Sequence, residues 1–331
     1  MSAARSPARR RFGIAAAITV VVLLVAHGAL WLVATGQLAA RWPATVMAVA
    51  ERGWAIEGGP PRRTGWPWAA AVEIPDFVVT GRFGGIPVRY TASRIDLAVT
   101  PFRPFALVAT PNGAQTFEAT GSPPVTIEAV RSALVIPLRG DDPYRFSVAE
   151  WSAISDAGAL HIANGYIEVM PDLLQTRISG RLDGAALGPA SQGSARLAFT
   201  AHIEPPLAPK ASAAATLEAW RAAGGHLTVV DANIEWGAAI ALIEGNLNLD
   251  PRLQPVFAGT IAVPDPGQAL DSLATARVLS PGQANAARAV LQLLGRARGG
   301  PAPLPLTIRD GTFRVANFAL VRLSPIDWAP P

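Results

Sequence analysis

The chain contains no cysteine among its 331 residues, which excludes disulfide bonds, thiolate metal ligands and cysteine nucleophiles. Its four histidines lie far apart in the sequence, and no HExxH stretch is present. The patterns GxxxxGK[ST], GxGxxG and GxSxG, which mark phosphate, dinucleotide and hydrolase sites, are absent as well. The sequence therefore predicts a protein that is not an enzyme and has no catalytic residues, metal site or cofactor.

Charge is also scarce, since only 16% of the residues are charged and the net charge is +4. Four arginines near the N-terminus, Arg5, Arg9, Arg10 and Arg11, account for this excess, and the rest of the chain carries 24 basic and 24 acidic residues. A nucleic-acid-binding protein would need a basic face on its folded body. We therefore expect no nucleic-acid partner.

Glycine and proline are abundant, with 30 of each scattered along the chain, and half of all residues are hydrophobic. Many turns argue against a helical bundle, and this balance predicts a mainly β (α+β) protein.

Residues 12–35 contain no Asp, Glu, Lys or Arg. A helix of this length, at about 1.5 Å per residue, crosses the roughly 30 Å hydrocarbon layer of a membrane. The arginines before this segment outnumber Arg41 and Arg52 after it, so the positive-inside rule places residues 1–11 in the cytoplasm. Residues 12–35 are thus predicted to be a transmembrane anchor, and the rest of the chain to be exported.

A cleaved signal peptide is the alternative interpretation, because Ala26, Gly28 and Ala29 resemble a cleavage site. The apolar run continues through residues 30–33, however, and Trp31 suits a membrane interface. We favour an uncleaved anchor.

Beyond the anchor, residues 38–53 have the composition of a helix, and we interpret residues 36–58 as a helical linker between membrane and body. The β-rich body then comprises residues 59–331, with a subdivision near residues 205–224. Two further helices are predicted inside it, at 212–223 and at 281–294, from their capping residues and apolar stripes.

Apolar residues alternate with polar ones elsewhere, as Ile95, Leu97 and Val99 do, and this period of two is typical of strands. Leu197 and Phe199 belong to another such segment. The pattern predicts strands with one apolar and one wetter face.

Three ten-residue stretches align without gaps: LHIANGYIEV (160–169), LTVVDANIEW (227–236) and LTIRDGTFRV (306–315). Asn-Gly and Asp-Gly favour two-residue hairpin turns, so we interpret each stretch as a strand, a turn and a strand. Chance similarity of short β segments is the alternative. Each predicted hairpin places an apolar quartet on one face: Leu160, Ile162, Ile167 and Val169; Leu227, Val229, Ile234 and Trp236; Leu306, Ile308, Phe313 and Val315. The first hairpin also places His161 opposite Glu168.

These hairpins predict a long, curled antiparallel sheet with a few helices packed on it. The twelve quartet residues line either an apolar groove or an ordinary closed core, and the sequence leaves both open.

The stretch GWPW, formed by Gly65, Trp66, Pro67 and Trp68, stands just before the first predicted strand. Both tryptophans project to the same side of an extended chain, as they would in an aromatic platform for a ligand. Proline restricts its own φ and the conformation of Trp66, which favours a structural corner instead.

The repeated hairpin pattern resembles that of the AsmA-like envelope proteins. The order of anchor, Gly53 to Phe77, Leu279 to Gly295 and the closing Leu306 to Val315 is similar to the alphaproteobacterial family called domain of unknown function 2125. That family also has a Gly-aromatic-Pro-aromatic corner before its first long strand, which GWPW matches.

This resemblance implies a protein of the bacterial inner membrane with one N-terminal helix and a periplasmic body. The AsmA-like relatives are associated with phospholipid transport through a hydrophobic groove lined by a sheet. We therefore expect a lipid or acyl chain as the partner. The alternative is an assembly factor that binds another envelope protein and has no ligand of its own.

Overall fold

The computed structural model describes residues 7–83, 86–140, 142–156, 158–188, 194–208, 210, 212–237, 239–275, 282, 303–316, 318–326 and 328. Its helices are α1 (Pro7–Ala50), α2 (Ala213–Ala222) and α3 (Pro266–Thr275). The first eight strands are β1 (Ala55–Glu57), β2 (Arg62–Thr64), β3 (Ala70–Phe83), β4 (Ile86–Thr100), β5 (Arg103–Ala119), β6 (Val125–Pro137), β7 (Tyr144–Ser155) and β8 (Gly158–Pro171). The other strands are β9 (Thr176–Leu187), β10 (Ala195–Glu204), β11 (His226–Trp236), β12 (Ala239–Leu249), β13 (Pro255–Ala262), β14 (Leu304–Arg309), β15 (Thr312–Val315) and β16 (Phe318–Arg322).

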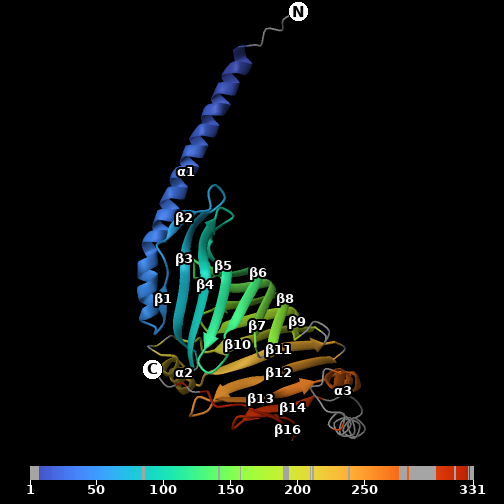
Figure 1. Ribbon diagram of the computed structural model, residues 1–331. Helices are drawn as coiled ribbons and strands as arrows, with labels where there is room; N and C mark the ends of the chain where they lie inside the picture. Colours follow the sequence, from blue (N-terminus) through green and yellow to red (C-terminus); the bar gives the residue numbers. More distant parts are fainter. Residues whose placement is uncertain are drawn as a thin grey trace, which may run out of the picture.

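All the strands belong to one antiparallel sheet, in which each strand from β3 to β16 pairs with the next one along the chain. The sheet twists strongly, so β3 and β4 run roughly along α1 while β12 and β13 lie across it (Figure 1). This arrangement confirms the predicted long, curled antiparallel sheet. Strands β10 and β11 pair directly, so the segment near residues 205–224 is a connection between neighbouring strands.

The connection contains α2, which confirms the helix predicted at 212–223. Ser212 caps it, because the Ser212 hydroxyl accepts a hydrogen bond from the Ala215 amide at 3.1 Å. The helix predicted at 281–294 lies outside the described residues, apart from Gly282.

One continuous helix, α1, contains both the predicted anchor and residues 36–50. It is long and apolar enough to cross a membrane, by length and composition. Its C-terminal part packs on β3 and β4, where Leu38, Ala39 and Trp42 contact the buried core of the sheet. Residues 36–50 are therefore part of the body. This differs from our interpretation of 36–58 as a linker, because apolar side chains of 36–50 pack on the sheet.

The GWPW stretch forms a turn directly before β3 that packs on α1. The Trp31 indole donates to the Ala69 carbonyl at 2.9 Å, and the Trp66 ring lies 5.9 Å from that of Trp31 between centroids. Gly65 has a φ of 91°, and a Cβ there would lie 2.7 Å from the Ala69 carbonyl oxygen. Only glycine fits this turn, which fixes the start of the sheet to the helix.

Two of the three predicted hairpins are wrong. Residues 160–169 belong to the single strand β8, and residues 227–236 to the single strand β11. In β8, Gly165 is buried because Leu182 of the next strand packs over it, where a Cβ would come within 2.6 Å of the Leu182 side chain. The glycine after Asn164 therefore allows close packing and makes no turn.

The third hairpin is confirmed. Strands β14 and β15 pair Leu306 with Val315 and Ile308 with Phe313, as predicted. Asp310 and Gly311 between them both have positive φ, 50° and 66°, which a tight two-residue turn requires.

The pairing predicted between His161 and Glu168 is also wrong, because it depended on the first hairpin. His161 Nδ1 lies 3.1 Å from the hydroxyl of Ser152 on β7, and its Nε2 lies 3.7 Å from Glu150. Glu168 instead lies 3.7 Å from Arg145.

A row of irregular backbone crosses the middle of the sheet, and we call it the crease. The crease contains one residue from each strand from β3 to β9. Four of them, on alternate strands, have positive φ: Asp76, Gly113, Glu150 and Gly184. The other three, on the strands between, have no partner in the strand pairing: Ser93, Val130 and Ala163. Such bulges re-aim the side chains that follow them. Within one strand, an even-numbered residue on one side of the crease therefore shares a face with an odd-numbered residue on the other side.

Candidate functional site: the apolar face of the sheet

One face of the sheet is apolar from end to end. Directly opposite residues in antiparallel strands point to the same side, so the strand register traces a face from strand to strand. The trace begins at Val72 and Ile74, which face α1. It continues through their partners Leu97 and Ile95 and so across the sheet to β15. We call this side the apolar face and the other side the polar face.

All twelve residues of the predicted quartets lie on the apolar face: Leu160, Ile162, Ile167, Val169, Leu227, Val229, Ile234, Trp236, Leu306, Ile308, Phe313 and Val315. In β8, Ile162 and Ile167 share this face because the crease at Ala163 lies between them. In β11, a register shift between Val229 and Ala232 has the same effect. The grouping is therefore as we expected, although a bulge produces it where we predicted a turn.

The quartets missed neighbouring residues of the same face, including Leu134 on β6, Phe146 on β7 and Phe199 on β10. The alternation around Phe199 was visible in the sequence, but it did not show which strands are neighbours. The Phe199 ring lies over Gly180 of β9, where a Cβ would meet it at 2.5 Å.

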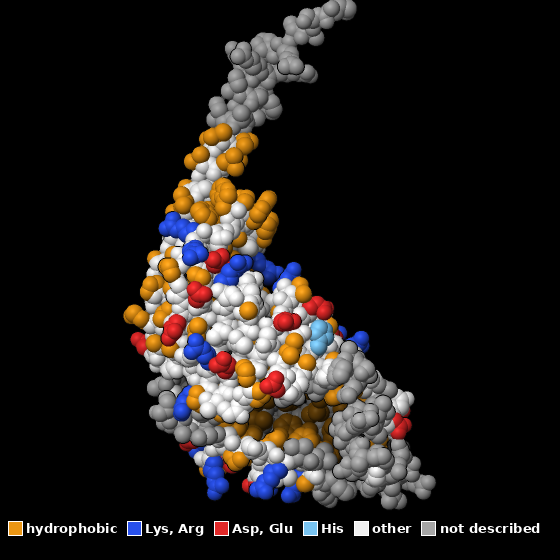
Figure 2. Space-filling view, viewed as in Figure 1, with side chains coloured by type: hydrophobic (Ala, Val, Ile, Leu, Met, Phe, Trp, Pro, Cys, Tyr) orange, Lys and Arg blue, Asp and Glu red, His pale blue; other side chains and the backbone are white. Residues whose placement is uncertain are grey.

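The apolar face is not closed along its length. Leu306 and Ile162 are only 2% and 8% exposed, but Leu134, Phe146 and Ile167 are 38%, 42% and 41% exposed. Figure 2 shows a hollow lined by hydrophobic side chains at the level of β12–β14. Helix α1 covers the apolar face at β3 and β4, at one end of the sheet.

Polar side chains on this face are few. The Tyr90 hydroxyl donates to Gln115 Oε1 at 2.7 Å, and burial raises the pKa of Tyr90 to about 12. Ser132 is 4% exposed, and its hydroxyl has no hydrogen-bond partner within the described residues.

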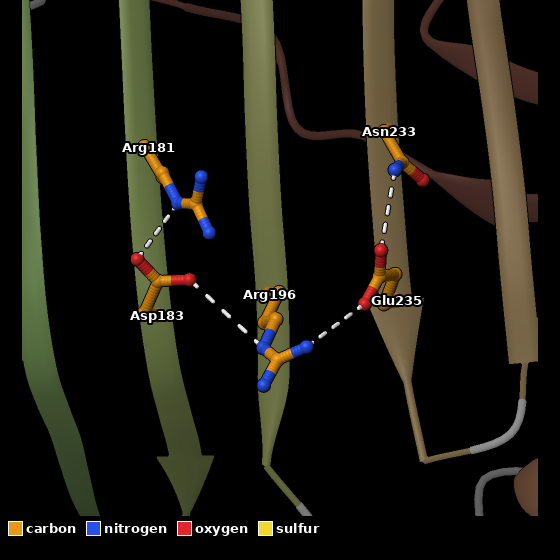
Figure 3. Close-up of polar contacts among 5 residues, drawn as sticks. All are labelled: Arg181, Asp183, Arg196, Asn233 and Glu235. Carbon is orange, nitrogen blue, oxygen red and sulfur yellow. Dashed lines mark hydrogen bonds and ion pairs between the residues drawn. The ribbon is translucent and has the colours of Figure 1, made fainter.

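The polar face carries ion pairs between neighbouring strands. On β9, Arg181 Nε lies 2.8 Å from Asp183, and Arg196 of β10 lies between Asp183 and Glu235 of β11, at 3.9 and 3.5 Å (Figure 3). The Asn233 amide donates to Glu235 at 3.3 Å. Asp183 raises the pKa of Arg181 through its hydrogen bond and its charge.

These pairs are exposed to solvent, and exposed ion pairs contribute little to stability. Nor does the polar face supply metal ligands: no group of three or more His, Asp or Glu residues with metal-binding geometry occurs in the described part of the chain. The polar face therefore keeps the sheet solvated on one side, and the apolar face is the candidate site.

The fold and this face define a class of protein: an open, single-layer antiparallel sheet with one apolar side, joined to an N-terminal helix able to span a membrane. The chain belongs to the family described as "Uncharacterized protein conserved in bacteria (DUF2125)", whose family model matches residues 31–324. This confirms the resemblance to domain of unknown function 2125. No curated protein and no solved structure matches the chain, so the likeness to AsmA proteins stays a prediction.

Tyr90 should make the stability of the protein depend on pH in the alkaline range. Its pKa in the folded protein, about 12, lies above the ordinary value of 10.0, so folding favours the protonated phenol. The resulting stabilisation is complete below pH 10.0 and is lost as the pH rises through about 12. Guanidinium unfolding midpoints should fall more steeply between these pH values in the native protein than in Tyr90→Phe. Parallel profiles would contradict this expectation.

Proposed function

We propose that the protein is a non-enzymatic, single-pass protein of the bacterial inner membrane whose exported body binds acyl chains of lipids on its apolar face. Export is supported by the arginines before the anchor, Arg5 to Arg11, which outnumber Arg41 and Arg52 after it. The family is bacterial, and an exported body anchored in an inner membrane lies in the periplasm.

The observation that carries the proposal is the half-exposed apolar face. A soluble sheet normally covers its apolar side with a second layer, and a large uncovered patch marks an interaction site. Here Leu134, Phe146 and Ile167 lie side by side on β6, β7 and β8, and each is more than a third exposed. The polar face opposite them carries Arg145 and Glu168, so only one side favours contact with hydrocarbon.

An acyl chain fits this surface because it needs no hydrogen-bond donors or acceptors. Each methylene removed from water contributes about 0.8 kcal/mol, so about ten methylenes supply on the order of 8 kcal/mol before the entropy of ordering the chain is subtracted. The exposed strands provide many such contacts and few polar groups.

Lipid binding is tested with a pair of isoleucines. Ile167 is 41% exposed on the apolar face, and Ile154 is 43% exposed on the polar face of the adjacent strand. Photo-crosslinking with a diazirine fatty acid should label the native full-length protein and Ile154→Glu equally. Labelling of Ile167→Glu should fall about tenfold, since a loss of about 1.4 kcal/mol of binding energy has this effect.

Mass spectrometry of lipids extracted from the purified protein gives an independent measurement. Equal labelling of the two variants, or a native protein that carries no lipid and is not labelled, would contradict the proposal.

The second candidate is an assembly factor that pairs with another envelope protein. It is favoured by β16 (Phe318–Arg322), which in the described part of the chain pairs with β15 on one side only. An unpaired edge is a template for strand addition. A crosslinked partner protein, recovered together with a native protein that carries no lipid, would support this candidate.

A further inference from the structure

The edge of the sheet nearest the anchor presents exposed apolar side chains at the tips of its turns. In the turn before β3, Trp68 is 79% exposed, and Phe102 between β4 and β5 is 92% exposed. Leu138, after β6, is 52% exposed. We call these three turns the rim. At the opposite edge, the described residues of the turns from β5–β6 to β9–β10, which are 120–124, 156, 188 and 194, include no exposed large hydrophobic side chain.

The first turn of the rim is fixed to α1 at the level of the predicted membrane span. In addition to the Trp31 indole, His27 Nε2 contacts the turn before β3, at 2.7 Å from the Pro67 carbonyl. His27 and Trp31 both lie within the uncharged run 12–35. A hydrocarbon layer that begins after Arg11 needs about 20 residues, so it ends near Trp31. The predicted span therefore places the turn before β3 at the membrane surface, where tryptophan is favoured.

Pairing between strands places the other two turns beside the first. Ala70 at the start of β3 pairs with Val99 at the end of β4, so Phe102 follows immediately on the same edge. The Leu138 amide donates to the Phe105 carbonyl at 2.8 Å, which holds the third turn against the start of β5.

Basic side chains accompany these apolar tips. Arg62 and Arg63 on β2 and Arg103 at the start of β5 are exposed, and the Arg139 guanidinium lies 3.3 Å from the centre of the Phe105 ring. Figure 2 shows basic side chains gathered on the body next to the exposed apolar segment of α1. Among the described residues of the three turns, one is acidic, Asp142. Apolar tips with arginines beside them match the interface of an anionic bilayer.

We propose that the rim docks on the anionic phospholipid surface of the membrane that holds α1, and so brings the sheet into contact with the bilayer. This inference rests on the proposed membrane anchor, and it holds whether or not the apolar face binds lipid. Its partner is the headgroup layer of the same membrane.

The absence of cysteine makes the test direct, because a single introduced cysteine carries the only label. An environment-sensitive fluorophore is attached to the full-length protein at one of three positions: Val25→Cys in the anchor, Phe102→Cys at the rim, or Ser122→Cys on the opposite edge. Each labelled protein is placed in nanodiscs of phosphatidylcholine and phosphatidylglycerol that contain lipids with a nitroxide near the headgroup.

We expect the fluorescence emission of the label at position 102 to shift to shorter wavelength and to be quenched by the nitroxide. The emission of the label at position 122 should neither shift nor be quenched. If the label at position 102 remains as unquenched as that at position 122 while that at position 25 is in the bilayer, the rim proposal is wrong. If the label at position 25 shows neither a blue shift nor quenching, the proposed anchor is wrong, and the rim proposal, which rests on it, is wrong with it; this result is distinct from failure of the rim alone.

The charge requirement has its own measurement. Quenching at position 102 should be stronger in nanodiscs with phosphatidylglycerol than in pure phosphatidylcholine, and Arg103→Gln should reduce that difference. Equal quenching in both compositions would overturn recognition of the anionic surface. Circular dichroism of each labelled protein serves as the folding control.

Discussion

Replacing Ile74 with alanine is expected to lower the free energy of unfolding by about 2–5 kcal/mol, the usual cost of deleting a buried isoleucine side chain. Ile74 is 0% exposed and lies in the cluster of Val72, Phe77 and Ala92. Trp42 of α1 packs against the same cluster, so the substitution would leave a cavity where the helix contacts the sheet. Guanidinium unfolding of the full-length protein in detergent, followed by circular dichroism, measures the loss.

The matched control is Ile154→Ala, since Ile154 is 43% exposed on the polar face. Its cost should stay below about 1 kcal/mol, the span of strand propensities. Similar midpoints for the two variants would show that the contact between α1 and β3 is not the core of the fold.

Alanine at Gly113 is expected to be strongly destabilising, because it meets two obstacles at once. Gly113 has a φ of 80°, which costs an ordinary residue about 1–2 kcal/mol. A Cβ there would also lie 2.7 Å from both Cβ and Oγ of Ser93. Forcing an extra atom into a packed site costs typically about 1–3 kcal/mol more.

Gly121 separates these two causes. It has a similar φ of 86°, but a Cβ there would meet no atom within 4 Å. Gly121→Ala should therefore show the backbone cost alone, and the unfolding midpoint of Gly113→Ala should be lower. Adding Ser93→Gly to Gly113→Ala should recover the steric part of the loss. A double variant no more stable than Gly113→Ala would mean that the crease does not depend on this contact.

Much of the architecture could be predicted because it depends on local composition. The uncharged run 12–35 predicts a helix of membrane-spanning length, and α1 is such a helix. Alternation around Leu97 and Leu197 predicts strands with one apolar side, and both leucines lie on the apolar face. Asp310-Gly311 gives the turn that its residues favour, since in the described part of the chain the pairing of β14 with β13 ends at Ile308, before the turn.

Asn164-Gly165 shows why similar local signals gave a different result. Strand β8 lies between β7 and β9, and both sides of Gly165 are paired, with Val148 and with Leu182. A turn there would lose these two ladders, so the backbone continues as a strand. The partners are other strands of the chain, and a ten-residue pattern carries no information about them.

The order of apolar and polar residues is enough to predict which side chains share a face, because a two-residue turn and a bulge both reverse the alternation. Ile162 and Ile167 are on the same side in either case. The choice between a turn and a bulge depends on the pairing of each strand with its neighbours, which exists only in the folded chain. The tertiary structure also decided that Ile167 stays 41% exposed, since no second layer covers the sheet at that position in the described part of the chain. Burial depends on what the rest of the fold places over a face, and the order of residues within a strand does not specify it.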